Sequence, residues 1–303
     1  MARQILRYNL LLHLTVLVFG FTAILGRLIR LQAEVLVWYR LVIAIGGILL
    51  YMAWRRRTVT TTLRGALTIS AAGLLISSHW VLFFAAVKAS NVSITVVCLS
   101  ISPLLVAFIE PVVFKRRIRP YEVGFGMLVV IGLWFIFRVE VNHSLGMLLA
   151  LCAAALSSIL AVVNARLIRH YNSSIIALYE LLGGLAGLSV YILVTGVGTM
   201  ALLPGLADLV YLLLLGLVCT TFAYLSFVEV MKVLSPYTVM LSVNLEPVYG
   251  IILALVIFGS SEYMSPGFYA GAGLIMTTIL ADGLLKRRES LQMTGDSSPP
   301  VPG

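Results

Sequence analysis

Three ionisable residues interrupt stretches of the chain that are otherwise apolar. Arg40 lies in VWYRLV, Glu180 in ALYELL and Glu246 in NLEPVYG. A charged side chain at the centre of a membrane helix costs about 2.5–3.5 kcal/mol or more, so it usually faces a bundle interior or a wet cavity. An arginine there can bind a carboxylate, and a glutamate can bind a cation or carry a proton. These residues therefore predict a polar site inside a membrane helix bundle.

The composition fits this interpretation. Of the 303 residues 61% are hydrophobic and 11% are charged, and the mean hydropathy is +1.06. A soluble domain needs more charge to cover its surface, so we expect an integral membrane protein with the lipid bilayer as a partner. The net charge of +9 comes from short basic clusters between apolar runs, which is a topology signal and not a nucleic-acid site.

The apolar runs predict ten membrane-spanning helices, since a span needs about 20 apolar residues. They are 9–29, 33–54, 66–87, 92–114, 121–138, 145–165, 174–195, 209–230, 236–258 and 267–285. The first run has no small-residue cleavage site, so we expect a retained helix and not a signal peptide. Residues 286–303 form a polar, proline-rich tail in the cytoplasm, for which we expect disorder.

Lys and Arg in the loops predict the orientation. With ten spans, sixteen basic residues fall on one side and only Arg27, Arg30, Lys88 and Arg138 on the other. Both termini should therefore be cytoplasmic, and we expect a multi-pass protein of the bacterial inner membrane.

Five pairs of similar segments occur in the same order in the two halves. They are RLIR (27–30) and RLIR (166–169), WYR (38–40) and LYE (178–180), AAVKASNVS (85–93) and EVMKVLSPY (229–237), SISPLLV (100–106) and NLEPVYG (244–250), and YEVGFG (121–126) and FYAGAG (268–273). The halves, 9–138 and 145–285, each hold five predicted spans. Because five is odd, the second half must cross the membrane in the opposite sense, and such inverted repeats are typical of secondary transporters.

The chain resembles the EamA-type members of the drug/metabolite transporter superfamily. The motifs that carry the resemblance are WYRLV in the second span, SISPLLV in the fourth, LEPV in the ninth and FGSSE (258–262) before the tenth. The resemblance implies a carrier of small metabolites, commonly an exporter of amino acids or related compounds, with a central cavity. The sequence departs from the family once, because the acidic residue that matches Glu262 is missing after the fourth span, where it reads FKRRIRP.

Arg40 and Glu180 are equivalent positions of the two halves. Each lies roughly 10 Å from an opposite face, at 1.5 Å per residue, so we reject a static ion pair between them. Arg40 either caps carbonyl groups and braces the outer half of the bundle, or recognises a substrate carboxylate. Glu180 has a structural role or lines the cavity and couples transport to an ion.

Glu246 is the first candidate for proton coupling, with Glu180 as the second. It lies near the midplane directly before Pro247, and Pro103 is the equivalent helix break of the first half. Paired broken helices point to a binding site. A pairing of Glu246 with Arg40 is not expected at these depths, which leaves His79 or Tyr249 as the partner, while a protonated structural glutamate is the alternative.

Other residues complete the predicted substrate cavity. They are Ser102 beside the first break, Ser242 and Tyr249 on the face of Glu246, His79, and the equivalent aromatic pair Trp80 and Tyr224, for all of which helix packing is the alternative. His13 is expected only to extend to the inner interface. Glu110 and Glu229, near predicted cytoplasmic helix ends, are expected to be interfacial.

The function that these patterns favour is secondary transport by alternating access. No Walker motif, zinc motif or nucleophile with a placed histidine occurs, and Cys98, Cys152 and Cys219 lie singly in apolar runs. We therefore expect no enzyme activity, no metal and no cofactor. The substrate is a small molecule, protons are an alternative coupling ion, and the protein acts as a monomer or a homodimer. A channel or a non-transporting membrane scaffold is the alternative function.

Overall fold

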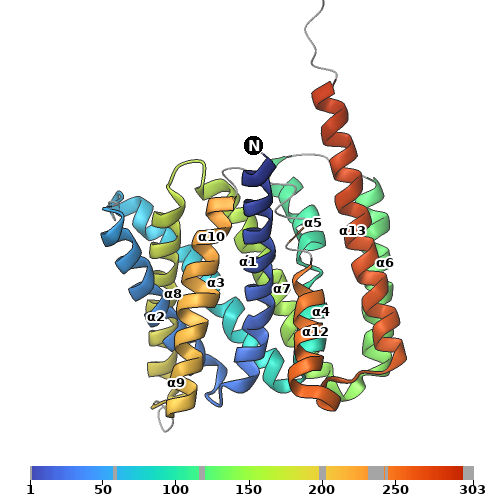
Figure 1. Ribbon diagram of the computed structural model, residues 1–303, viewed down its shortest axis with the longest axis horizontal. Helices are drawn as coiled ribbons and strands as arrows, with labels where there is room; N and C mark the ends of the chain where they lie inside the picture. Colours follow the sequence, from blue (N-terminus) through green and yellow to red (C-terminus); the bar gives the residue numbers. More distant parts are fainter. Residues whose placement is uncertain are drawn as a thin grey trace, which may run out of the picture.

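The computed structural model is a bundle of helices (Figure 1). It describes residues 2–56, 60–115, 120–197, 203–230, 242 and 245–295, except the side chains of 2–5, 227–229 and 286–295. Within these residues every regular element is helical, which confirms the predicted all-α class. Nine of the described helical segments are long and apolar enough to cross a membrane. The predicted ninth span, 236–258, lies partly outside the described residues.

The helices follow the predicted spans closely. In the first half they are α1 (Ala2–Leu28), α2 (Ala33–Trp54), α3 (Leu63–Ala89), α4 (Val92–Leu99), α5 (Ser102–Phe114) and α6 (Pro120–Val139). The short η1 (Val141–His143) leads into the second half, which contains α7 (Ser144–Leu167), α8 (Ser173–Thr195), α9 (Leu206–Leu213), η2 (Leu214–Phe222), α10 (Ala223–Val230), α12 (Glu246–Phe258), η3 (Gly259–Glu262) and α13 (Pro266–Gly295).

The fourth span is broken where proline occurs. α4 ends at Leu99, and α5 restarts at Ser102 with Pro103 in its first turn. Proline fits a first turn because its missing N–H would have no partner there, whereas in mid-helix it removes a hydrogen bond. α12 likewise begins at Glu246 with Pro247 in its first turn. Residues 243 and 244, which precede α12, lie outside the described residues, so the structure describes the break at Pro103 and not the one expected at Pro247.

The eighth span is not the ordinary α-helix that its composition predicts. Between α9 and α10, η2 is a π-helix over Leu214–Phe222. The hydroxyls of Thr220 and Thr221 each donate to a carbonyl five residues earlier, on Leu215 at 2.8 Å and Gly216 at 3.1 Å. π-helical turns are rare and frequently mark functional sites.

Helix packing centres on α3, which lies against both α7 and α8. α1 packs against α10 and α12, α2 against α8 and η2, and α6 against α13 at one edge of the bundle (Figure 1). Glycine permits the closest approach, because a Cβ on Gly73 of α3 would lie 2.1 Å from the backbone oxygen of Glu180 on α8. Small residues at helix contacts are the usual means of close packing in a membrane.

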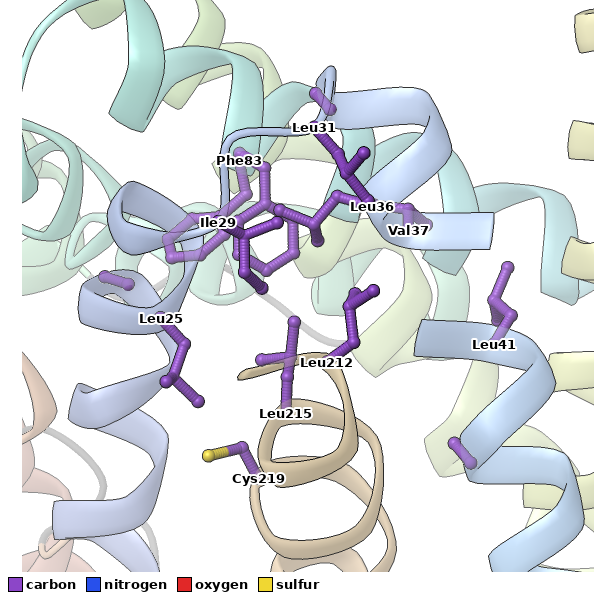
Figure 2. Close-up of a cluster of buried hydrophobic side chains, with 14 of the residues drawn as sticks. Leu25, Ile29, Leu31, Leu36, Val37, Leu41, Phe83, Leu212, Leu215 and Cys219 are labelled. Carbon is purple, nitrogen blue, oxygen red and sulfur yellow. The ribbon is translucent and has the colours of Figure 1, made fainter. Parts of the chain in front are cut away.

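The largest apolar cluster lies where α1 turns into α2. Leu25 of α1 and Ile29, which directly follows α1, meet Leu36 of α2, Phe83 of α3 and Leu215 of η2, and all five side chains are buried (Figure 2). This contact fixes the first turn of α2 against η2. It thereby sets the position of Arg40, which follows one turn further along α2.

The C-terminal helix differs from the prediction. The sequence indicates a span that ends at residue 285 and a disordered tail from 286, whereas α13 continues as a helix to Gly295. Leu, Lys, Arg and Glu are good helix formers, and extending an existing helix avoids the cost of nucleation. The extension lies at the same end of the bundle as the N-terminus (Figure 1). Residues 296–303 lie outside the described part.

Candidate functional site

Arg40 is the centre of the candidate site. Its side chain is only 5% exposed. The Nε atom donates to the Thr220 hydroxyl of η2 at 2.9 Å, and the guanidinium lies 3.7 Å from the centre of the Trp80 ring of α3. The Phe84 ring lies 5.6 Å away. Arg40 therefore joins α2 to η2 and α3 through one hydrogen bond and two cation–π contacts.

The Arg40 guanidinium is not fully paired. Its Nη1 atom is buried and has no hydrogen-bond partner. A buried donor without an acceptor costs about 1–3 kcal/mol, and more when the group is charged. A planar guanidinium binds carboxylates through two parallel hydrogen bonds. The free Nη1 is therefore suited to an anionic group of a ligand.

Glu246 lies close enough to Arg40 for their charges to interact. Their charged atoms do not come within the 4 Å of an ion pair. This agrees with the expectation that Glu246 and Arg40 do not pair.

The two partners that were expected for Glu246 make other contacts. His79 Nδ1 lies 2.9 Å from the Ala153 oxygen of α7, and the Tyr249 hydroxyl lies 3.2 Å from His13 Nδ1 of α1. His13 thus bonds to α12 and does not simply extend to the interface. His79 still lies within electrostatic range of Arg40.

Glu180 forms a second polar group in the bundle. Its side chain is 3% exposed, and it forms a side-chain hydrogen bond with Asn164 of α7. The Oε1 atom is buried without a hydrogen-bond partner. Tyr224 of α10 lies within electrostatic range, and its hydroxyl donates to the Ser173 oxygen at 3.0 Å. Glu180 and Arg40 thus each keep one unpaired polar atom, in separate groups.

The predicted serines are not equivalent. Ser102 donates to the Leu99 oxygen at 2.8 Å and lies 3.1 Å from the Ser157 hydroxyl of α7, so it bridges the break between α4 and α5. This contact holds α5 against α7. Ser242 is buried, and most of the residues around it in the sequence lie outside the described part.

Thr220 and Asn164 were missed by the sequence analysis. Both are neutral polar residues, and threonine is common in membrane helices, so residue type alone gave no reason to select Thr220. Asn164 could have been noticed as an amide within the apolar run VVNARL. Among the described residues no group of three His, Cys, Asp or Glu side chains is arranged to hold a metal ion.

A bundle of helices that are long and apolar enough to cross a bilayer, with a break in mid-span and a buried, incompletely paired arginine, fits a multi-pass membrane protein. The chain belongs to the EamA-like transporter family, whose pattern matches residues 6–138 and again residues 144–281. This confirms the family that the motifs indicated.

Two further comparisons agree. An uncharacterized transporter, YxxF, of Bacillus subtilis (strain 168) is 25% identical over 260 residues, which cover 81% of this chain and 76% of that protein. The crystal structure of another protein superposes with a TM-score of 0.65 over 93% of this chain and 99% of the other, at 16% identity. That likeness shows the shared fold.

Proposed function

We propose that this transporter exports amino acids or related amphipathic metabolites by alternating access. The observation that carries the proposal is the buried, unpaired Nη1 of Arg40 above the Trp80 ring, with Glu246 within electrostatic range. A zwitterion can place its carboxylate on Arg40 and its ammonium towards Glu246, while its apolar part lies against Trp80. Opposite charges that are near but unpaired favour such a ligand over a simple anion.

The packing of the helices supports two inverted five-helix halves of ten spans, 9–138 and 145–285. In this proposal η2 is the equivalent of α3, and α2 is the equivalent of α8. The contact of α3 with α8 then corresponds to the contact of η2 with α2. In the same way, the contact of α1 with α12 corresponds to the contact of α7 with α5. The family pattern also matches twice. In such repeats, exchanging the conformations of the two halves converts an inward-open state into an outward-open state.

One pair of glycines supports the equivalence of the α3–α8 contact with the η2–α2 contact. A Cβ on Gly73 would lie 2.1 Å from the Glu180 oxygen, and one on Gly216 would lie 3.5 Å from the Arg40 oxygen. Gly73 and Gly216 differ by 143 positions, whereas Trp80 and Tyr224 differ by 144. The π-helix contains Gly216 and ends before Tyr224, so its wider turns between these two residues accommodate the extra residue.

In this proposal, transport is coupled to protons, which Glu246 carries. Glu246 is the first residue of α12, and the α1–α12 contact beside it is close, since a Cβ on Gly20 would lie 3.3 Å from the Glu246 oxygen. A carboxyl beside a contact between opposed halves can take up a proton in one state and release it in the other. Glu180 is the alternative carrier.

Transport assays in proteoliposomes test the function. A panel of radiolabelled neutral amino acids is offered to reconstituted protein, and we expect saturable counterflow that excess unlabelled substrate abolishes. Arg40→Gln should abolish counterflow, whereas Arg30→Gln, a matched loss of charge on an exposed side chain, should preserve it. Flux that rises linearly with concentration would favour a channel, and no flux with any compound of the panel would contradict the proposed substrate class.

A further inference from the structure

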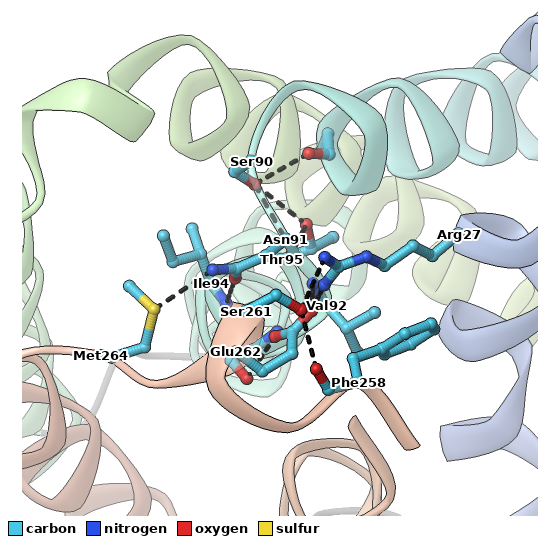
Figure 3. Close-up of polar contacts among 12 residues, drawn as sticks. Arg27, Ser90, Asn91, Val92, Ile94, Thr95, Phe258, Ser261, Glu262 and Met264 are labelled. Carbon is cyan, nitrogen blue, oxygen red and sulfur yellow. Dashed lines mark hydrogen bonds and ion pairs between the residues drawn. The ribbon is translucent and has the colours of Figure 1, made fainter. Parts of the chain in front are cut away.

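Glu262 is a buried charge outside the candidate site that is paired on several sides. Its side chain is 0% exposed, and it forms an ion pair with Arg27 at the end of α1. It also accepts hydrogen bonds from the Val92 amide at 3.0 Å and from the Ser93 amide and hydroxyl at 2.9 and 2.7 Å (Figure 3). One carboxylate therefore connects η3, α4 and α1.

The local sequence explains why Glu262 lies there. Gly259 has a φ of +56°, a conformation that favours glycine, and it ends α12 so that η3 can turn towards α4. The first amides of a helix lack intrahelical partners, and the helix dipole favours an anion beside them. Asn91 satisfies the Ile94 amide at 2.9 Å, and Glu262 satisfies the two amides before it. Glu262 is thus held by α4 even without Arg27.

Arg27 adds the connection to α1. Its Nη2 atom donates to the Ser261 hydroxyl at 3.1 Å, and its guanidinium lies 4.4 Å from the centre of the Phe258 ring (Figure 3). The chain that follows Arg27 is attached to two more helices, because Lys88 of α3 donates to the Ile29 oxygen at 2.7 Å and Asp208 of α9 accepts from the Arg30 amide at 3.0 Å. The turn from α1 to α2 is therefore tied to elements of both halves.

The first half lacks an acid at the position equivalent to Glu262. Arg166 is the repeat equivalent of Arg27, and its side chain is exposed. The segment equivalent to FGSSE is FKRRIRP, which contains four basic residues and no acid.

We propose that the Arg27–Glu262 cluster is a lock on the extracytoplasmic end, and that this lock makes the inward-facing state the resting state. Opening the outer end separates α1 from α4 and η3, and this leaves a buried carboxylate without its cation. The resting carrier then offers its site to the cytoplasm, as an exporter requires. The inference rests on the orientation and the alternating access of the proposed function.

Distances between spin labels at the outer end test the lock. Cysteines replace Gln32 and Tyr263, which are both exposed and lie on the two sides of the lock, in a chain whose Cys98, Cys152 and Cys219 are changed to alanine. Pulsed electron–electron double resonance in proteoliposomes then gives the populations of short and long distances. We expect Arg27→Gln to raise the ratio of long to short by about tenfold, the effect of losing a hydrogen bond to a charged group.

Three variants make the result specific. Arg30→Gln removes the same charge from the same turn and should leave the distances unchanged, whereas Arg27→Lys keeps the charge and should restore most of the short population. Ser93→Ala removes one bond to Glu262 and should shift the ratio less than Arg27→Gln. Unchanged distances in a folded Arg27→Gln protein would overturn the lock. These distance measurements need no substrate. They can therefore contradict the lock while counterflow supports the proposed function, and they can support the lock while counterflow contradicts the proposed function.

Discussion

The hydroxyl of Thr220 accepts a hydrogen bond from Arg40 Nε at 2.9 Å and so joins the π-helical turn of η2 to α2. The two residues are 180 positions apart, and each belongs to a different match of the family pattern. Thr220 also donates to the Leu215 oxygen, five residues back, within the π-helical segment. The π-helical turn therefore orients the Thr220 hydroxyl, and this hydroxyl positions the buried side chain of Arg40.

The substitution Thr220→Val tests this consequence. Valine keeps the shape of threonine but removes the hydroxyl, so Arg40 loses a fixed orientation. We expect the KM for transport to rise by about 3- to 10-fold, as the loss of one hydrogen bond implies, with little change in the amount of folded protein. Thr220→Ser should restore the wild-type KM. Equal losses for valine and serine would show that the hydroxyl is irrelevant.

Exchanging the charges of Arg40 and Glu180 should not rescue transport. Arg40→Glu and Glu180→Arg should each inactivate counterflow, and the double variant should stay inactive, because Arg40 contacts Thr220 and Trp80 while Glu180 contacts Asn164. Counterflow by the single and double variants is the measurement. Full recovery in the double variant would mean that the two charges pair directly during transport.

Neutralising Glu246 should separate coupling from binding. Glu246→Gln keeps the shape and an oxygen that can accept a hydrogen bond from the substrate ammonium, but it cannot carry a proton. Uptake driven by an imposed pH gradient should therefore fail, while substrate, although bound more weakly, still protects the carrier against thermal unfolding. Glu110→Gln, which changes a carboxyl nearer the end of α5, is the control and should keep the gradient response. If Glu246→Gln responds to the gradient like the wild type, Glu180 becomes the candidate.

The contact of α3 with α8 predicts a large difference between two glycines. Gly73→Ala would place a methyl group 2.1 Å from the Glu180 oxygen, so the helices must separate, which costs about 1–3 kcal/mol. A Cβ on Gly46 of α2 would meet nothing within 4 Å, so Gly46→Ala should be neutral or slightly stabilising. Thermal unfolding in detergent compares the two variants. Equal melting temperatures would contradict the described helix contact.

The orientation is tested by reporter fusions at the C-terminus. We expect a reporter that is fluorescent only in the cytoplasm to be active, and alkaline phosphatase, which requires the periplasm, to be inactive. The reason is the concentration of basic residues on one side, which stay cytoplasmic. The opposite pattern would overturn the topology, the inverted repeat and the placement of the lock together.

The sequence by itself determined the class of protein, the family and the approximate limits of nine helical spans. These follow from local properties, because the thickness of the bilayer sets the length of an apolar run and proline disrupts a helix wherever it occurs. The break at Pro103 lies within a few residues of its predicted place. The buried arginine could be selected for the same reason, since a charge in an apolar run stands out.

Only the tertiary structure decided what the selected residues contact. Arg40 meets Thr220, His13 meets Tyr249, and Glu262 meets the first turn of α4, each across more than 160 positions of the chain. Such pairs depend on how the helices cross and rotate, and on a π-turn that shifts every later residue of its helix. Hydropathy is nearly uniform around these helices and carries little information on rotation, so the partners of a buried polar group cannot be predicted from its own segment.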